Sequence, residues 1–494
     1  MRLELCGKIN TLYVQSLCMM FFRGEKFPEN EENPKGVLKV CTDTTENGIN
    51  VQAQLWYDGQ ESSAESYVEL LDGESVERTS KIAVGQAVFS ACVRITGYQP
   101  PWGLLTGIRP SLVAKELIDK YGEDIAYSVL CDTYYLSCDK ASLAITVAKY
   151  EGEILDKYDG NTCSLYVSIP FCPTRCTYCS FISYATKKLF DLLPDYVDRI
   201  VEDIGKTVAF IKDKGLKVST VYVGGGTPTT LNPVQLERVL GAISNSLDVA
   251  LLDEFTVECG RPDTITAEKI NVLKKYGVSR VSVNPQSLND DVLVEIGRKH
   301  TVKDFFDAYN LVSKSEIDVV NTDLIAGLDG DNFESFKSTV DKIIELNPEN
   351  ITVHTFSVKK SAQILQDNKG IYHNDGEIAL QSVEYAFKAL RECGYLPYYM
   401  YRQKNTVSDL ENVGYAKKGT FCMYNVLMMG DGHTVFGIGA GATTKLVSRD
   451  NGKTEIYRIF SAKYPYEYLQ DNRNYLEKIK EFFERGSKNE NDQC

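Results

Sequence analysis

The segment YVSIPFCPTRCTYC, residues 166–179, carries the strongest chemical signal in the chain. It begins as a β-branched strand and ends in a C-x3-C-x2-C run formed by Cys172, Cys176 and Cys179. Three thiolates on one short loop can bind three irons of a 4Fe-4S cluster, and this loop supplies no fourth thiolate. The spacing therefore predicts an iron-sulfur cluster with one iron open to a further ligand.

An open iron can be chelated by the amino and carboxylate groups of a methionine moiety. An electron from the cluster would then break the adjacent sulfonium C–S bond, and the resulting 5'-deoxyadenosyl radical would abstract hydrogen from carbon. Two alternatives remain open for the cysteines. One is a structural zinc site, which normally needs four ligands, although the nearest downstream histidine is His300. The other is a redox dithiol pair.

Downstream of Cys163, short β-branched runs alternate with amphipathic helical segments, which is typical of parallel strands joined by helical crossovers. We expect each strand end to deliver a loop to one common face, as in a TIM-like barrel. Six such units predict an α/β fold with a partial (β/α)6 barrel. The expected strands are 165–169, 220–223, 255–258, 279–283, 319–325 and 351–356.

The flanking segments predict an N-terminal α+β accessory domain and a C-terminal α+β module. Before the barrel we expect strands at 37–41 and 51–56 and helices at 76–95, 111–120 and 138–158. After it we expect a helix at 376–393, a strand at 395–401, a glycine-dense stretch at 430–441 and a charged helix at about 466–485 beside the barrel mouth. The predicted limits are 1–160, 161–360 and 361–485, with a disordered tail at 486–494.

The bulk composition predicts a cytoplasmic protein with several domains. A chain of 494 residues exceeds the roughly 250–300 residues at which single cores stop growing. Its 68 acidic and 54 basic residues give a net charge of −14, which opposes nonspecific binding to nucleic acid or to anionic membranes. Apolar runs fall short of the roughly 20 residues that a membrane span needs. The 14 cysteines are mostly single and set in apolar segments, which indicates reduced thiols.

At these motifs the chain resembles the radical S-adenosylmethionine (SAM) superfamily, over roughly residues 163–445. Its flanking motifs resemble the oxygen-independent coproporphyrinogen III oxidase-like branch. The long N-terminal domain and two segments, PWGLLTGIRP at 101–110 and YYMYRQKN at 398–405, resemble the HemZ-type coproporphyrinogen dehydrogenase group. The resemblance implies a radical SAM oxidoreductase with a 4Fe-4S cluster and S-adenosylmethionine as cofactors.

The resemblance also assigns residues to the methionine end of S-adenosylmethionine. In GGGTPT, residues 224–229, it assigns Gly225, Gly226 and Thr227, although an ordinary turn before a helix would read the same way. Tyr166 matches a residue that lines the same pocket, where an isolated aromatic would otherwise be core. Glu258 ends the third expected strand and can bind a cationic amino group, or it is an exposed turn acid.

The remaining assignments concern the carboxylate, ribose and adenine of the same cofactor. Arg298 resembles the arginine that pairs with the methionine carboxylate, the alternative being a solvated surface arginine. Gln286 and Asp323 resemble the ribose ligands, and a polar ligand would give a reason for Asp323 among apolar neighbours. Ile325 and Ser357 match positions that contact adenine.

The family relationship implies a tetrapyrrole substrate, coproporphyrinogen III, whose propionates undergo oxidative decarboxylation to vinyl groups in haem (porphyrin) biosynthesis. Such an anionic substrate calls for basic side chains, and by position the candidates are Arg175, Arg261, Arg402 and Lys404. A low-potential flavodoxin or ferredoxin would suit as electron donor. An open-iron cluster is expected to be oxygen sensitive, which suggests anaerobic function.

Phe181 departs from the oxidase pattern, because the best-matching oxidases have a further cysteine two residues after the last cluster cysteine. The phenylalanine is shared with the haem-chaperone branch. A second hypothesis is therefore a haem-binding trafficking protein, with the candidate axial ligands His300, His354, His373 and His433. A third is a radical methyltransferase acting on haem.

Overall fold

The computed structural model describes residues 1–28, 34–71, 73–179, 185–357, 376–403, 409–450, 453–471 and 475–491. The chain forms two compact units. The smaller consists of Met1–Lys149 with Met400–Glu411, and the larger of Tyr150–Tyr399 with Asn412–Cys494. These units divide the chain differently from the predicted limits at 160 and 360, because a short downstream segment returns to the smaller unit.

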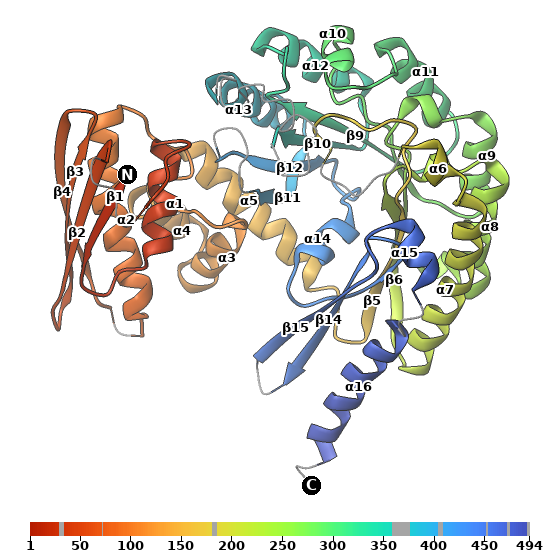
Figure 1. The fold of residues 1–494 in the computed structure, drawn as a ribbon, viewed down its shortest axis with the longest axis horizontal. Helices are drawn as coiled ribbons and strands as arrows, with labels where there is room; N and C mark the ends of the chain where they lie inside the picture. Colours follow the sequence, from red (N-terminus) through yellow and green to blue (C-terminus); the bar gives the residue numbers. More distant parts are fainter. Residues whose placement is uncertain are drawn as a thin grey trace. The chain divides into compact units, whose positions relative to one another are not determined.

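The smaller unit is built on a four-stranded sheet covered on one face by helices (Figure 1). Along the sheet, in this order, lie β1 (Arg2–Cys6), β2 (Gly36–Thr44), β3 (Gly48–Tyr57) and β4 (Gln60–Glu69), with helices α1 (Thr11–Phe21) and α2 (Val76–Thr96). Strands β2 to β4 form an antiparallel meander, and β1 pairs parallel with β2. In β3, Val51, Ala53 and Leu55 alternate with exposed polar residues and are buried.

The strands expected at 37–41 and 51–56 are confirmed as parts of β2 and β3. Strand β4 was not predicted, because its sequence QESSAESYVE buries fully only Ala64 and so lacks a clear apolar alternation. The helices expected at 76–95, 111–120 and 138–158 are confirmed as α2, α3 (Pro110–Tyr121) and α5 (Cys138–Leu155). A further helix, α4 (Glu123–Asp132), was missed.

A buried ion pair joins distant segments within the smaller unit. Lys140 of α5 donates to Glu411 at 2.5 Å, and the side chains are only 2% and 0% exposed. The indole N–H of Trp102 donates to the other oxygen of Glu411 at 2.6 Å. The backbone N–H of Arg402 donates to the Ile108 carbonyl, and its guanidinium donates to the Leu105 carbonyl. Segment 101–110 therefore shares one core with Arg402 and Glu411, whereas residues 404–408 lie outside the described residues.

The larger unit contains the expected partial barrel. Its six central strands are parallel neighbours in chain order: β5 (Thr162–Ile169), β6 (Lys217–Gly225), β7 (Glu254–Glu258), β8 (Arg280–Ser282), β9 (Val319–Ala326) and β10 (Asn350–Thr355). Strands of a parallel sheet are buried on both faces, so they read as β-branched runs, and all six are confirmed. The α/β partial-barrel fold is thus the one expected from the sequence.

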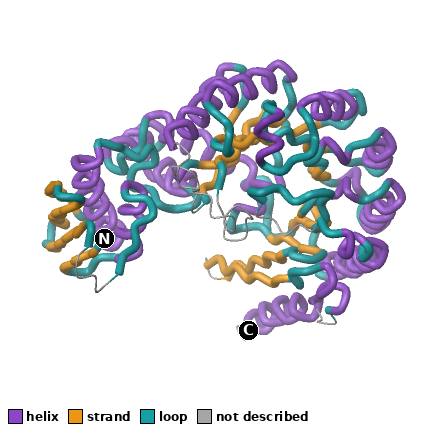
Figure 2. Tube along the Cα trace, turned by 45° about the horizontal axis from the view of Figure 1, so that its top comes forward, coloured by secondary structure: helices purple, strands orange, loops and turns teal. Residues whose placement is uncertain are grey.

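Helices between the strands form the outer layer of this barrel (Figures 1 and 2). They are α6 (Lys187–Phe190), α7 (Leu193–Asp213), α8 (Pro233–Ser246), α9 (Ala267–Lys275), α10 (Asp290–Glu295), α11 (Val302–Ser313) and α12 (Phe333–Leu346), with short 3-10 turns η1 (Pro228–Thr230), η2 (Val249–Leu251) and η3 (Pro262–Thr264). Their buried residues recur at helical spacing, as in α7 with Ile200, Ile204 and Ile211. Among the described residues, we find no helix that combines the length and the apolar character of a membrane span.

The C-terminal segment extends the barrel sheet at both edges. Strand β12 (Glu411–Ala416) pairs antiparallel with β10, and β11 (Leu396–Arg402) follows it; β13 (Thr434–Ile438) pairs parallel with β5, followed by β14 (Thr443–Asp450) and β15 (Lys453–Phe460). The helices are α13 (Gly376–Glu392), α14 (Met423–Met429), α15 (Pro465–Gln470) and α16 (Tyr475–Asn491). The single charged helix expected at 466–485 is therefore two helices. Helix α16 also continues through Asn491, past the limit at which a disordered tail was expected.

Removing Lys140 is expected to destabilise the smaller unit strongly. In Lys140→Met, Glu411 stays buried but loses its ammonium partner, and breaking a buried ion pair on one side costs about 3–5 kcal/mol. Urea unfolding followed by tryptophan fluorescence measures this directly, because both tryptophans, Trp56 and Trp102, belong to this unit. An unchanged unfolding midpoint would contradict the role given to the pair.

Two controls distinguish the stability lost by leaving a buried charge from the stability lost by removing the lysine side chain. The double variant Lys140→Met/Glu411→Gln removes both charges and leaves an amide oxygen for the Trp102 N–H, so it should recover much of the lost stability. Lys115→Met breaks an exposed pair with Asp119 on α3 and should cost less than about 0.5 kcal/mol.

Candidate functional site

The cysteine loop leaves the carboxyl end of β5, where a packed aromatic anchors its start. Phe171 is fully buried, and its ring packs edge-on against that of Tyr196 at 5.2 Å. Cys172 and Cys176 follow, each 8% exposed, and Cys179 is partly exposed. The N–H of Cys179 donates to the carbonyl of Cys176 at 3.2 Å, which curls the loop back on itself.

The three cysteines fit a cubane cluster better than a single metal ion. Among the described residues, no three His, Cys, Asp or Glu side chains converge as the ligands of one ion would. A 4Fe-4S cluster instead takes one thiolate on each of three irons, so its protein ligands need not meet at a point. His300 belongs to no such converging group in the described part of the chain, so it does not complete a zinc set with the cysteines.

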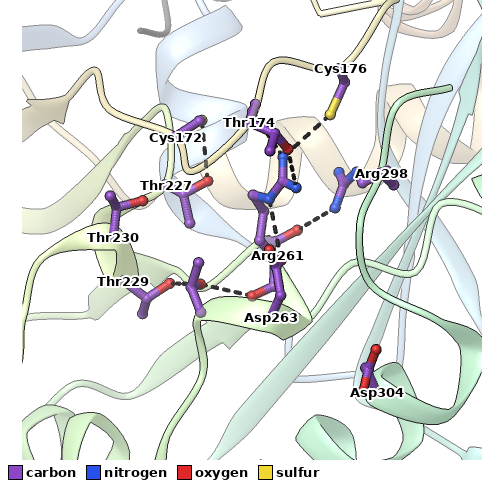
Figure 3. A network of polar contacts seen from close by, with 12 residues as sticks. Cys172, Thr174, Cys176, Thr227, Thr229, Thr230, Arg261, Asp263, Arg298 and Asp304 are labelled. Atoms are coloured by element: carbon purple, nitrogen blue, oxygen red, sulfur yellow. Dashed lines mark hydrogen bonds and ion pairs between the residues drawn. The ribbon is translucent and has the colours of Figure 1, made fainter. Parts of the chain in front are cut away.

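The glycine segment after β6 packs directly against the start of the cysteine loop. The N–H of Gly226 donates to the Ile169 carbonyl at 2.9 Å, and the N–H of Thr227 donates to the Phe171 carbonyl at 2.8 Å. A Cβ on Gly226 would lie 2.6 Å from that Phe171 oxygen. The Thr227 hydroxyl lies 3.4 Å from the Cys172 sulfur (Figure 3). An ordinary turn does not require such a close contact between its backbone and another loop. The glycines therefore allow two loops of one site to pack together.

Gly225 also depends on the absence of a side chain. It has a φ of +109°, and a Cβ there would lie 2.9 Å from the Ser168 hydroxyl. This conformation ends β6 and turns the chain towards the cysteine loop. The backbone of Gly225 also hydrogen bonds to Glu258, the carboxylate that ends β7.

Glu258 lies beside a stack of tyrosines inside the barrel. The Tyr222 hydroxyl donates to Glu258 at 2.6 Å, and the Tyr222 ring stacks on Tyr424 at 4.4 Å and on Tyr166 at 6.2 Å. Burial raises the pKa of Glu258 to about 7, and the Asp323 carboxylate adds to the shift while Tyr222 opposes it. A carboxyl with this pKa is poised to ionise when a cationic group binds beside it.

Asp323 on β9 is held by amide side chains. Asn284 donates to one carboxylate oxygen at 2.7 Å, and Asn321 donates to the other at 2.8 Å. Burial alone would raise the pKa of Asp323, but the nearby His354 and the hydrogen bond from Asn321 outweigh it and hold the pKa below its ordinary value. The carboxylate is therefore ionised at neutral pH and fixed in orientation.

Gln286 and Ile325 are joined through their backbones. The N–H of Gln286 donates to the Asp323 carbonyl, and the N–H of Ile325 donates to the Gln286 carbonyl, each at 3.0 Å. Gln286 has a φ of +67°, which is uncommon for a residue other than glycine and indicates a strained turn. Ser357 follows β10, the next strand along the sheet. These residues therefore occupy neighbouring positions, and their contact with ribose and adenine stays a prediction.

Arg298 is buried rather than solvated, at 8% exposure. Its guanidinium donates to the carbonyl of Gly260 at 3.0 Å and to the hydroxyl of Tyr178, inside the cysteine loop, at 3.1 Å. The structure therefore brings Arg298 to the cysteine loop, close to where a cofactor carboxylate is expected. Its pairing with that carboxylate remains a prediction.

Several site residues were missed from the sequence because they sit among ordinary strand and loop residues. They are Tyr178, Tyr222, Asn284 and Tyr424. Tyr222 and Asn284 share one signal that the sequence contains: each lies near the carboxyl end of a barrel strand, two or three residues before a predicted residue. Tyr424 comes from α14, and nothing local in its sequence indicates that it reaches the barrel interior.

The residues proposed for substrate or haem are not gathered in one place. Arg175 is exposed, Arg261 is buried at 3% exposure beside the cysteine loop, and Arg402 lies in the core of the smaller unit. Lys404, His373 and Phe181 lie outside the described residues. Among the described histidines, His354 lies 3.9 Å from Asp323, and His433 hydrogen bonds to Ser164; burial lowers the pKa of His300 to about 4.

Comparison with known proteins agrees with this geometry. Residues 166–343 match the family model described as the radical SAM superfamily. The chain is 33% identical over 486 residues to the oxygen-independent coproporphyrinogen-III oxidase-like protein HemZ of Bacillus subtilis, covering 96% of each chain. It is also 29% identical over 316 residues to the heme chaperone HemW of Escherichia coli, covering 64% of this chain and 77% of that one.

A solved structure shows a similar fold. The coproporphyrinogen III oxidase HemN of Escherichia coli, described as a radical SAM enzyme, superposes with a TM-score of 0.52 and 21% identity. The match covers 65% of this chain and 71% of that chain. At this identity the likeness supports the fold alone.

Alanine at Gly226 is expected to disrupt the site. The new Cβ would meet the backbone of Phe171 at 2.6 Å, and a backbone cannot move aside as a flexible side chain can. We expect Gly226→Ala to retain less than half of the iron of the wild type after anaerobic reconstitution and to melt at a lower temperature. The control is Gly205→Ala in α7, where a Cβ meets nothing within 4 Å and helix propensity favours alanine by about 0.5–1 kcal/mol. Equal iron content in the two variants would refute the role of Gly226.

Ionisation of Glu258 is expected to make binding of S-adenosylmethionine pH dependent. With a pKa of about 7, the carboxyl is mostly protonated at pH 6 and mostly ionised at pH 8, so affinity for a ligand whose amino group donates to this carboxylate should rise about tenfold over this interval. Titration calorimetry on anaerobic, cluster-loaded protein measures it. Glu258→Gln is the reference, because any protonation change of the ligand itself affects its binding to both proteins equally. An identical pH dependence in both proteins would contradict the assignment.

Proposed function

Because the chain belongs to the radical SAM superfamily and to the family of the Bacillus subtilis HemZ-like protein, we propose that it is an oxygen-independent coproporphyrinogen III oxidase (dehydrogenase). It converts propionate side chains of a porphyrinogen into vinyl groups. The observation that carries this proposal is the relationship to the HemZ-like protein over 96% of both chains, which includes the smaller unit as well as the barrel. That relative's name describes it only as oxidase-like, so the substrate is proposed here.

Different residues of the site hold the two cofactors. Cys172, Cys176 and Cys179 hold the 4Fe-4S cluster, and the glycine segment supports the backbone around it. When bound, the reduced cluster and S-adenosylmethionine supply a 5'-deoxyadenosyl radical. Glu258 receives the amino group, and the stacked rings of Tyr166, Tyr222 and Tyr424 form the apolar wall beside that carboxyl.

The proposed reaction on the substrate balances as an oxidation. Hydrogen is removed from the β-carbon of a propionate, carbon dioxide leaves from the carboxylate, and one further electron passes to an acceptor. The result is a vinyl group, and two propionates are converted in turn. The electron that reduces the cluster is supplied by a flavodoxin or ferredoxin in this proposal.

A haem chaperone is the second candidate, favoured by a specific observation. Heme chaperones named HemW match the chain at 29–32% identity in several bacteria. In Escherichia coli the match covers 64% of this chain, against 96% for the HemZ-like protein. We rank the oxidase function above the chaperone function because the HemZ-like protein matches more of the chain. A radical methyltransferase acting on haem is the third alternative.

Anaerobic turnover separates these functions. Reconstituted protein is incubated with coproporphyrinogen III, dithionite and S-adenosylmethionine, and products are followed by chromatography and mass spectrometry. We expect 5'-deoxyadenosine, harderoporphyrinogen and protoporphyrinogen to accumulate, and Cys176→Ala to yield none of them.

Two other results would point elsewhere. Formation of 5'-deoxyadenosine without either porphyrinogen product would overturn the substrate. Stoichiometric haem binding without turnover would favour the chaperone, and a methylated haem product would favour the methyltransferase.

A further inference from the structure

Arg261 directs its guanidinium at the cysteine loop (Figure 3). It lies just after β7, where Gly260 leads into the 3-10 turn η3, and it is only 3% exposed. Its Nη1 donates to the Thr174 carbonyl at 3.0 Å, and its Nη2 donates to the Thr174 hydroxyl at 2.6 Å. The same Nη1 lies 3.5 Å from the sulfur of Cys176. One side chain thus contacts both a cluster ligand and the residue midway between two ligands.

The burial of this charge needs compensation, because a guanidinium without partners is costly to remove from water. Part of the compensation comes from Asp263, whose carboxylate lies 3.3 Å from Nε. The remainder comes from Thr174 and Cys176. All three guanidinium nitrogens are therefore engaged, and the side chain is not turned outward towards an anionic substrate. This geometry differs from the substrate-binding role that position alone suggested.

The planar fork of arginine explains why this residue type suits the position. Nη1 and Nη2 bond two oxygens of the same threonine, which fixes the direction of the loop as well as its distance. Arg298 holds a second point of the same loop through the Tyr178 hydroxyl. The Cys172–Cys179 loop is therefore clamped at two positions by buried arginines.

The charge of Arg261 also bears on electron transfer. Hydrogen bonds to cluster sulfurs and nearby positive charge stabilise the more negative, reduced state, and so raise the reduction potential. Cys176 is the ligand that receives this bond. A cluster that is easier to reduce lowers the demand on its electron donor.

We propose that Arg261 is a positioning residue that clamps the cluster loop through Thr174 and raises the reduction potential of the cluster through Cys176. The inference rests on the cluster, not on the porphyrinogen substrate. Failure of coproporphyrinogen turnover would therefore leave it standing. Its test likewise uses no porphyrinogen.

The first measurement is a redox titration of anaerobically reconstituted protein, followed by electron paramagnetic resonance. At the midpoint potential of the wild type, Arg261→Gln should have at least a tenfold lower ratio of reduced to oxidised cluster, equivalent to about 59 mV for one electron. Arg238→Gln, an exposed arginine of α8 paired with Asp198, is the matched control and should titrate as the wild type does. A glutamine variant with full iron and a ratio within twofold of the wild type would overturn the proposal.

The second measurement tests the clamp without changing charge. Thr174→Val removes the hydroxyl that accepts from Nη2, so a chelator should extract iron at least threefold faster than from the wild type. An unchanged rate would overturn the clamp.

Arg261→Lys covers the case in which the glutamine variant cannot hold four irons. Lysine keeps the positive charge but not the fork, so where Arg261→Lys alone retains iron, its redox titration tests the charge effect: a ratio within twofold of the wild type supports the proposal, and a tenfold lower ratio overturns it. Loss of iron from both arginine variants, together with wild-type extraction from Thr174→Val, would overturn the proposal.

Discussion

The close backbone contact between two loops is the constraint on which the candidate site depends. The N–H groups of Gly226 and Thr227 reach carbonyls at the start of the cysteine loop, and no side chain can stand between them. Parallel strands β5 and β6 bring these loops to the same end of the sheet, but pairing alone does not set their separation. The absence of a Cβ on Gly226 allows this short separation. The start of the cysteine loop, up to Phe171, is thereby held against the glycine segment.

Charge in the site is arranged in two distinct ways. Arg261, Arg298 and Asp323 are each held by two or more hydrogen bonds, so their directions are fixed before any ligand binds. Glu258 is different, because burial raises its pKa to about 7, although Tyr222 and the backbone of Gly225 hydrogen bond to it. The first three groups give the site its shape. The Glu258 carboxyl is the group that can respond to an incoming cation.

The sequence predicted what depends on local pattern and missed what depends on neighbours. The six barrel strands were predictable because strands of a buried parallel sheet are rich in apolar and β-branched residues, whereas polar β4 carried too little signal. The cysteines, the glycine segment and Glu258 were visible at strand ends. Arg261 was noticed, but its direction was not, because Thr174 is 87 residues away and a sequence does not show which way a side chain turns. Tyr424 was missed because it enters the barrel from a later helix.

The discontinuity of the smaller unit has a consequence for biosynthesis. Lys140 and its counter-ion Glu411 are 271 residues apart, and the whole barrel is encoded between them. At roughly 5–20 residues per second, a ribosome needs about 14–54 s to supply the missing acid. During that interval the nascent N-terminal segment cannot complete its core. The six barrel strands thus emerge while the smaller unit is unfinished, and this unit, although it begins the chain, can close only after those strands have been made.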